Sequence, residues 1–312
     1  TVAPKEITVT PDNASKVYGE SDKEFTYTPS GLVGEDTLSD ITLSRAEGDN
    51  VGTYEITASQ KKDANPNYSV KFNKGTFTIN PKEITVTITP NGGTYDGNII
   101  SAAAVLNGLV GEDKPEIILI YAGKANDGTE VNGTKTPVLA GTYTVTASIT
   151  DSNYNLKAEG TTAEFVVTKA TPGLSVAAVS DRSYGEGAFK LGVSNKGDGL
   201  KSYVSSNEKV VTVDEKGTVT IVGAGTATLT VSLAESANYT ADRKAVTVTV
   251  APKEITVTAD NQKKIAGEAD PVLTYTADGL VGEDTLSGIT VKRKAGEKVG
   301  TYAVTVSQKA GA

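Results

Sequence analysis

One heptapeptide, PKEITVT, occurs three times in this chain, at residues 4–10, 81–87 and 252–258. A hexapeptide, GLVGED, follows each copy, at residues 31–36, 108–113 and 279–284. The two motifs share one register, because the spacing between successive copies is the same for both. Such self-similarity indicates an array of tandem units.

The tripeptide GTY marks a further shared point, at residues 52–54, 141–143 and 300–302. Its distance from GLVGED shows that the second copy carries an insertion that the first and last copies lack. The insertion lies within IYAGKANDGTEVNGTKTP, whose Gly, Asn and Asp content predicts an extended hairpin or loop. The long interval between the second and third copies leaves room for one more unit, in which AGTATLTV from Ala224 matches AGTYTVT from Ala140.

We therefore predict four tandem domains, at residues 1–81, 82–169, 170–251 and 252–312. The first copy continues past its GTY strand with NPNYSVKFNKGTFTIN, whereas the fourth stops at Ala312. The fourth domain is thus expected to be C-terminally incomplete, and to be the most mobile unit or to borrow a strand from a neighbouring molecule.

Local periodicity predicts an all-β fold. Apolar residues alternate with Thr in segments such as KEITVTP, GTFTIN, GTYEIT and AVTVTVA, which is the pattern of half-buried antiparallel strands. Each unit of about 80 residues fits an Ig-like sandwich. The alternative is a β-grasp-like sheet with a short helical turn at Gly34–Ser39. Because Pro81 and Pro252 stand in very short linkers, the domains are expected to form an extended rod.

Composition excludes several classes of function. The chain has no Cys, His, Met or Trp, so thiolate sites and the commonest general base and metal ligand are absent. We expect no catalytic residues, no cofactor and no metal, and therefore no enzyme. A net charge of -8 disfavours nucleic acid, and the apolar runs are too short for a membrane span, so we expect no direct membrane contact in this fragment.

The adjacent carboxylates of GLVGED, such as Glu35 and Asp36, raise the question of a metal or acid/base site. They have no partner cluster at a fixed spacing, which favours a turn anchored by Leu32, Val33 and Leu38. The GTY tyrosines are expected to fill the core, with the hydroxyl reaching a turn amide; sugar stacking is the alternative. The three Asn-Tyr pairs, at 67–68, 153–154 and 238–239, are expected to close a loop before the last strand.

The segment KVYGESDKEFTYTPSGLVGEDTLSDITLSRAEGDNVGTYEITASQ resembles the MBG repeats of bacterial surface proteins and adhesins. The fourth unit, AGEADPVLTYTADGLVGEDTLSGITVKRKAGEKVGTYAVT, resembles them as well, and TYDGN in the second unit resembles the related YDG type. The third unit, SSNEKVVTVDEKGTVTIVGAGTATLTVSLAESANYTA, is similar to bacterial Ig-like group-two domains and lacks GLVGED. The resemblance implies a secreted, extracellular stalk and supplies no catalytic residues.

Together these observations predict a non-enzymatic stalk or spacer of a secreted bacterial cell-surface protein, which presents an adhesive tip and is anchored outside this fragment. The alternative is an adhesin module that binds host glycan or protein through the inserted loop. The candidate contact residues are Asn126, Asp127, Thr129, Glu130, Asn132 and Lys135. Other than such a ligand, the expected partners are neighbouring domains of the same chain, and the chain is expected to be a monomer.

Overall fold

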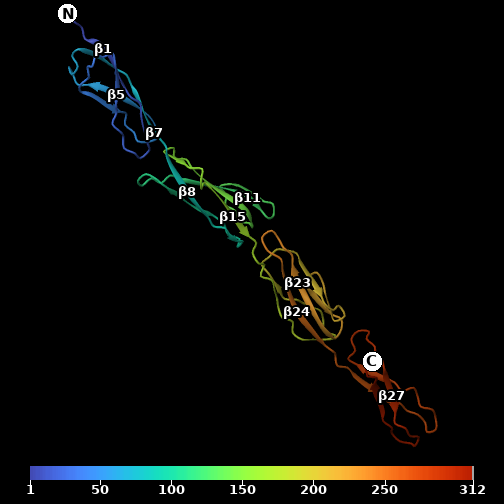
Figure 1. The fold of residues 1–312 in the computed structure, drawn as a ribbon. Coiled ribbons are helices and arrows are strands. Elements are labelled where there is room, and N and C mark those ends of the chain that lie inside the picture. Colours follow the sequence, from blue (N-terminus) through green and yellow to red (C-terminus); the bar gives the residue numbers. More distant parts are fainter. Residues whose placement is uncertain (311–312) are drawn as a thin grey trace. The chain divides into compact units, whose positions relative to one another are not determined.

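The computed structural model describes residues 1–310. All regular secondary structure in these residues is β-strand. The chain forms two compact units, 1–170 and 171–312, each of which is considered by itself. Figure 1 follows the strands from blue at the N-terminus to red at the C-terminus. The predicted all-β fold class is confirmed. Gly311 and Ala312, which the predicted fourth domain includes, lie outside the described residues.

Residues 1–81 form two sheets, with strand orders β3-β1-β6 and β2-β7-β5-β4. The seven strands are β1 (Lys5–Pro11), β2 (Ala14–Val17), β3 (Tyr27–Ser30), β4 (Ile41–Arg45), β5 (Gly52–Gln60), β6 (Tyr68–Phe72) and β7 (Gly75–Asn80). Ile56, Phe77 and Ile79 are at most 1% exposed and form the core between the sheets. Strand β7 shows why the alternation matters, since its apolar residues are buried and its threonines are more exposed.

Residues 82–169 also form two sheets, with orders β10-β8-β14 and β12-β11-β13-β15-β9. The eight strands are β8 (Lys82–Pro90), β9 (Gly93–Thr94), β10 (Ala102–Asn107), β11 (Ile117–Ala125), β12 (Glu130–Gly133), β13 (Gly141–Ile149), β14 (Tyr154–Leu156) and β15 (Thr162–Thr168). Strands β11 and β12 pair antiparallel, so the inserted segment is a hairpin, as predicted. Only Pro81 separates β7 from β8.

In the second unit, residues 171–251 form sheets of orders β17-β24-β23-β20, β18-β22-β21 and β16-β19. The nine strands are β16 (Ser175–Val176), β17 (Arg182–Ser183), β18 (Phe189–Lys190), β19 (Val193–Ser194), β20 (Lys201–Ser205), β21 (Val211–Val213), β22 (Thr218–Ile221), β23 (Gly225–Leu233) and β24 (Asp242–Ala251). Leu229, Val231 and Val248 are buried in its core. Strands β23 and β24 form the longest ladder of this segment.

Residues 252–310 hold two separate strand pairs. Strand β25 (Thr256–Ala259) pairs with β26 (Tyr275–Asp278), and β27 (Ile289–Arg293) pairs with β28 (Val304–Gln308). Within the described residues of this segment, no strand corresponds to β6 or β7 and no side chain is fully buried.

Two local expectations are corrected. The strands are not all antiparallel: β6 lies parallel to β1, β7 to β2, β14 to β8, β15 to β9 and β17 to β24.

The expected helical turn over Gly34–Ser39 is also wrong. Gly34 has a φ of 58°, which a right-handed helix does not allow, and the Asp36 amide bonds the Val33 carbonyl in a tight turn. Two sheets without a helix, over residues 1–81, correspond to the sandwich alternative.

In residues 1–310, every strand pair joins strands of one predicted domain. The division into four domains with the stated boundaries nevertheless remains a prediction, because the compact units are two.

Candidate functional site

The inserted hairpin places all six candidate contact residues on exposed positions. The Asn126 amide donates to the Ala140 carbonyl at 2.8 Å, and Gly128 closes the turn onto Ala125 at 3.0 Å. The Asp127 carboxylate accepts the Thr129 amide at 2.8 Å, a bond that lowers the pKa of Asp127. The tip of the hairpin is therefore a fixed turn.

The hairpin brings only some of the candidates together. Asp127 and Thr129 share a hydrogen bond at the tip. Glu130 and Asn132 stand two residues apart on β12, so their side chains lie on the same face. Lys135 lies beyond the end of β12. The arrangement supplies scattered hydrogen-bonding groups on a strand edge.

In the first two copies, the acidic hexapeptide is a turn that a tyrosine hydroxyl closes. In the first copy, the Tyr68 hydroxyl accepts the Val33 amide at 3.0 Å and donates to the Asp36 carboxylate at 2.5 Å. In the second copy, Tyr154 bonds the Val110 amide at 3.0 Å and the Asp113 carboxylate in the same way. In these two copies the tyrosine of the Asn-Tyr pair closes a loop through its hydroxyl, and the sequence did not indicate that GLVGED is its partner. The expected role of the third pair, at 238–239, stays a prediction.

The second copy also receives a side chain from residues 1–81. The Tyr18 hydroxyl donates to Asp113 at 2.9 Å, and its ring meets that of Tyr154 edge-on with centroids 5.3 Å apart. A few residues away, Asn153 accepts the Val51 amide at 2.8 Å and bonds Asn50 at 3.1 Å. Within the first unit, residues 1–81 and 82–169 are therefore joined by hydrogen bonds as well as by the chain.

The second unit repeats this contact. Tyr184 donates to Asp284 at 3.3 Å. The valines of the two GLVGED turns, Val110 and Val281, lie against the glycines that follow Tyr18 and Tyr184. This contact was not predicted from the sequence, although Tyr-Gly-Glu at both 18–20 and 184–186 was a signal for it.

The environment of Tyr154 makes its hydrogen bond to Asp113 sensitive to alkaline pH. Burial, and then the hydrogen bond to Asp113, raises the pKa of Tyr154 from 10.0 to about 12. Because the pKa of Tyr154 is higher in the folded state than in the unfolded state, its protonated phenol stabilises the fold. This stabilisation is complete below the unfolded pKa of about 10 and is lost as the pH rises through the folded pKa of about 12. We expect the difference in tyrosinate absorbance between wild type and Tyr154→Phe to titrate near pH 12. An Asp113→Ala variant should titrate lower, and a midpoint near pH 10 in wild type would contradict the assignment.

The GTY tyrosines bind the backbone, and Tyr143 and Tyr54 also belong to or pack against a core. Each phenol donates to the backbone carbonyl four residues earlier: Tyr54 to Asn50, Tyr143 to Leu139 and Tyr302 to Lys298, at 2.7, 2.9 and 2.8 Å. Tyr143 is fully buried, whereas Tyr54 and Tyr302 are half-buried. The hydroxyl thus binds a carbonyl and not the expected amide.

Four charged side chains form a cluster against the core of the first segment. Asp22 lies 2.8 Å from Lys16 Nζ and 2.5 Å from Arg45 Nε, and the Arg45 guanidinium stands 5.0 Å above the Phe77 ring. Asp49 completes the cluster. The hydrogen bond from Arg45, and then that from Lys16, lowers the pKa of Asp22. This cluster was not predicted from the sequence.

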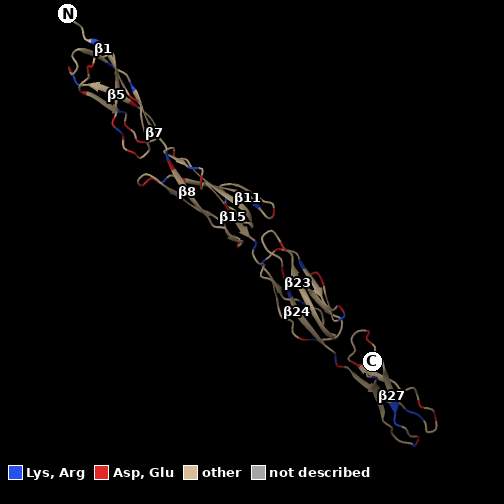
Figure 2. Cartoon of the chain, in the orientation of Figure 1, with Lys and Arg blue, Asp and Glu red and all other residues tan. Residues whose placement is uncertain are grey.

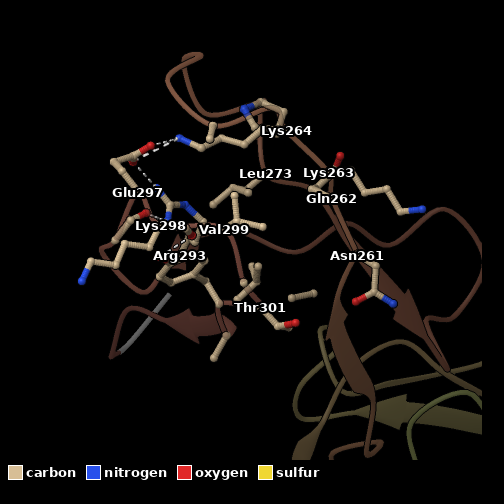
Figure 3. Close-up of a pocket in the computed structure, with 18 residues that line it drawn as sticks. Asn261, Gln262, Lys263, Lys264, Leu273, Arg293, Glu297, Lys298, Val299 and Thr301 are labelled. Atoms are coloured by element: carbon tan, nitrogen blue, oxygen red, sulfur yellow. Dashed lines mark hydrogen bonds and ion pairs between the residues drawn. The ribbon is translucent and has the colours of Figure 1, made fainter.

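The same cluster recurs in the fourth segment, beside a cavity. Lys264 and Arg293 bond Asp270 at 2.8 and 2.9 Å and also bond Glu297. Figure 3 shows Lys264 and Arg293 converging on Glu297 above Val299 and Leu273. The cavity measures about 630 Å³.

In the first segment, core side chains fill the space that corresponds to this cavity. Its residues at the positions of Leu273, Val299 and Tyr302 are Phe25, Val51 and Tyr54, which pack against the core of Phe77, Ile79 and Ile56. The cavity therefore lies where the first segment carries β7.

No group of three or more acidic side chains that could hold a metal ion occurs in residues 1–310. Across the same residues, no helix has the length and apolar character of a membrane span. Figure 2 shows short acidic and basic stretches scattered along both units.

Comparison with known families matches two stretches, 7–78 and 255–312, to the MBG domain (YGX type). Residues 185–235 match the intimin immunoglobulin-like domain. These lie where the sequence analysis predicts MBG-type and Ig-like domains. No curated protein matches the chain.

Solved structures align with the chain at low similarity. Drosophila N-cadherin EC1-3 aligns at 10% identity and a TM-score of 0.22, over 77% of this chain and 98% of that one. Domains 1–6 of the surface layer protein SbsC align at 17% identity and a TM-score of 0.26, over 89% of this chain and 45% of that one. A SusE-like surface located polysaccharide binding protein from Bacteroides thetaiotaomicron aligns at 12% identity and a TM-score of 0.23, over 95% and 67%.

Proposed function

We propose that this chain, which contains two MBG domains of the YGX type and an intimin-type Ig-like segment, is a non-enzymatic spacer of a secreted bacterial cell-surface protein. The observation that carries the proposal is the bonded contact between successive segments. Tyr18, Asp113 and Asn153 make it in the first unit, and Tyr184 and Asp284 make it in the second. A spacer needs such contacts because a chain of loosely tethered domains does not hold a tip at a distance.

The surface suits this role. Acidic and basic residues are interspersed, the net charge is -8, and threonines cover much of the strands, a composition that keeps a repeat array soluble. Both matched families are structural and supply no catalytic group to this chain. We propose that the spacer belongs to a larger cell-surface protein, which also carries the adhesive tip and the anchor.

Small-angle X-ray scattering tests the spacer. A strand of about ten residues spans roughly 33 Å, so four domains end to end are expected to reach about 130–160 Å. A compact globule of this length has a radius of gyration of roughly 20 Å. A variant with Tyr18→Ala, Tyr184→Ala and Asn153→Ala should show a broader distance distribution. A compact particle for the wild type would refute the proposal.

A second candidate, direct adhesion, is favoured by the exposed polar side chains of the inserted hairpin. The chain would be screened on arrays of host glycans and matrix proteins. A variant with Glu130→Ala, Asn132→Ala and Lys135→Ala keeps the Asp127–Thr129 turn, so it removes contacts without removing the hairpin. An affinity at least tenfold lower in this variant than in the wild type would establish adhesion. If the wild type binds no glycan or protein on the arrays, only the spacer function stands.

A further inference from the structure

We infer that the turn Gly31–Asp36 is a docking surface for a Tyr-Gly-Glu turn carried by another domain. Each of the other two GLVGED turns already contacts a Tyr-Gly-Glu turn. Asp113 accepts a hydrogen bond from the Tyr18 hydroxyl, and Asp284 accepts one from the Tyr184 hydroxyl. This inference goes beyond the proposed function, because it applies equally to a spacer and to an adhesin.

The two donor turns have the same internal geometry. In the first, the Glu20 side chain accepts the Val17 amide at 3.1 Å, and the Glu20 amide bonds the Val17 carbonyl at 3.0 Å. In the other, the Glu186 side chain and amide bond Ser183 at 2.9 and 3.1 Å. The glutamate therefore closes the turn on itself and leaves the tyrosine and the glycine to face the neighbour.

The glycine makes room for the valine of the other turn. A Cβ at Gly19 would lie 2.4 Å from Val110 Cγ2, and one at Gly185 would lie 2.6 Å from Val281 Cγ2. The two glycines also have φ values of +84° and +89°, which L side chains rarely adopt. The recognition thus has two parts, a hydroxyl bonded to a carboxylate and a backbone packed against a valine.

The first GLVGED turn has the acceptor side of this contact. Tyr68 holds Val33 and Asp36 as Tyr154 holds Val110 and Asp113. Val33 is 53% exposed, whereas Val110 and Val281 are half-buried under their glycines. An open cavity of about 440 Å³ lies beside Asp36 and Tyr68. Among the described residues, no Tyr-Gly-Glu turn contacts this surface.

The sequence that enters the first segment indicates the occupant. TVAPKEITV at residues 1–9 is identical to residues 249–257, which carry the chain from the Tyr184 segment to the Asp284 segment. The occupant we assign is therefore a Tyr-Gly-Glu turn of the Tyr184–Glu186 type, in a domain that leads into Pro4 through Thr-Val-Ala.

Engineered disulfides test this assignment, because the chain contains no cysteine. A copy of residues 171–248 is placed directly before Thr1 of the full chain, so that it runs into Thr1-Val2-Ala3 as residue 248 runs into 249–251. The pair to be linked is Gly185→Cys in the copy and Val33→Cys. After mild oxidation, the linked fraction is read by peptide mass spectrometry.

Two control pairs calibrate the result. Gly19→Cys with Val110→Cys, in the unextended chain, should link, because the Cβ positions lie 3.3 Å apart, close to the range of about 3.5–4.5 Å in disulfides. The copied Leu200→Cys with Val33→Cys should not link, because Leu200 is an 82% exposed residue outside the turn. We expect the test pair to link to an extent comparable with the first control, and Asp36→Ala to reduce it.

Linking no greater than that of the Leu200 pair, while the Gly19 pair links, would overturn the inference. A second measurement needs no cysteine and so does not depend on whether the substitutions are tolerated. Hydrogen exchange of amides 31–36 should be slower in the extended chain than in the unextended one, and unchanged exchange would also overturn it.

Discussion

Replacement of Asp22 by alanine is expected to lower the free energy of unfolding of residues 1–81 by about 3 kcal/mol or more. The Lys16 and Arg45 side chains are only 6% and 11% exposed, and in residues 1–310 Asp22 is the one carboxylate that lies within 3 Å of both. Its loss leaves two cations against the Phe77 ring with only the more distant Asp49. Chemical denaturation followed by tyrosine fluorescence measures the loss.

Two comparisons isolate the cause. Asp270→Ala removes the matching carboxylate of the fourth segment, where Lys264 is 19% exposed and Glu297 also bonds both cations, so the loss should be smaller. The pH dependence is a further check. The pKa of Asp22 is lowered in the folded state, so its contribution is present above the unfolded value of about 3.9 and is lost as the pH falls through the folded one. The wild type and Asp22→Ala should therefore converge below about pH 4, and an equal difference at all pH values would contradict the ionic explanation.

Grafting residues Lys61–Pro81 onto Gln308, in place of residues 309–312, is expected to slow hydrogen exchange in β27 and β28 by a hundredfold or more. Gln60 and Gln308 are equivalent in the repeat, so the graft supplies counterparts of β6 and β7 to the segment that has none among its described residues. Burial of side chains such as Phe77 and Ile79 contributes about 1.5–3 kcal/mol each, and about 1.4 kcal/mol corresponds to a tenfold change.

A second graft with Phe77→Ser and Ile79→Ser is the matched control. It has the same length and the same backbone hydrogen-bonding groups, but it lacks the side chains that would fill the cavity beside Arg293 and Tyr302. It should slow exchange far less than the first graft. Equal exchange in the native chain and both grafts would show that this cavity is not the place of a β7-like strand, and that the expected mobility of the fourth segment has another cause.

Sequence reasoning was most successful where the structure is local. Alternation along one strand, a Gly-rich hairpin tip and a tyrosine at a fixed point of a strand depend on neighbours in the chain, and each is present as predicted. The parallel pairs were missed because a period of two fixes the faces of a strand and not the direction of its partner.

The contacts that join segments were missed for a related reason. Tyr18 and Asp113 are 95 residues apart, and nothing in either stretch alone points to the other. The signal lay in the repeats: Lys16, Asp22 and Arg45 recur with the same residue types in the fourth segment, and Tyr-Gly-Glu occurs only in units that a GLVGED unit follows. The inserted hairpin stays the candidate contact surface, since its six candidate residues are exposed.

The donor turn is independent of the domain that carries it. It is found on the first segment and on the third, although these two differ in sheet order and in core residues. An exchange of genetic material within the repeated TVAPKEITV sequence would therefore add or remove whole segments and still leave a matching pair of ends at each new join. The two copies begin at Thr1 and Thr249, so such an exchange changes the length of the product in steps of three predicted domains, and each product inherits the same connector chemistry.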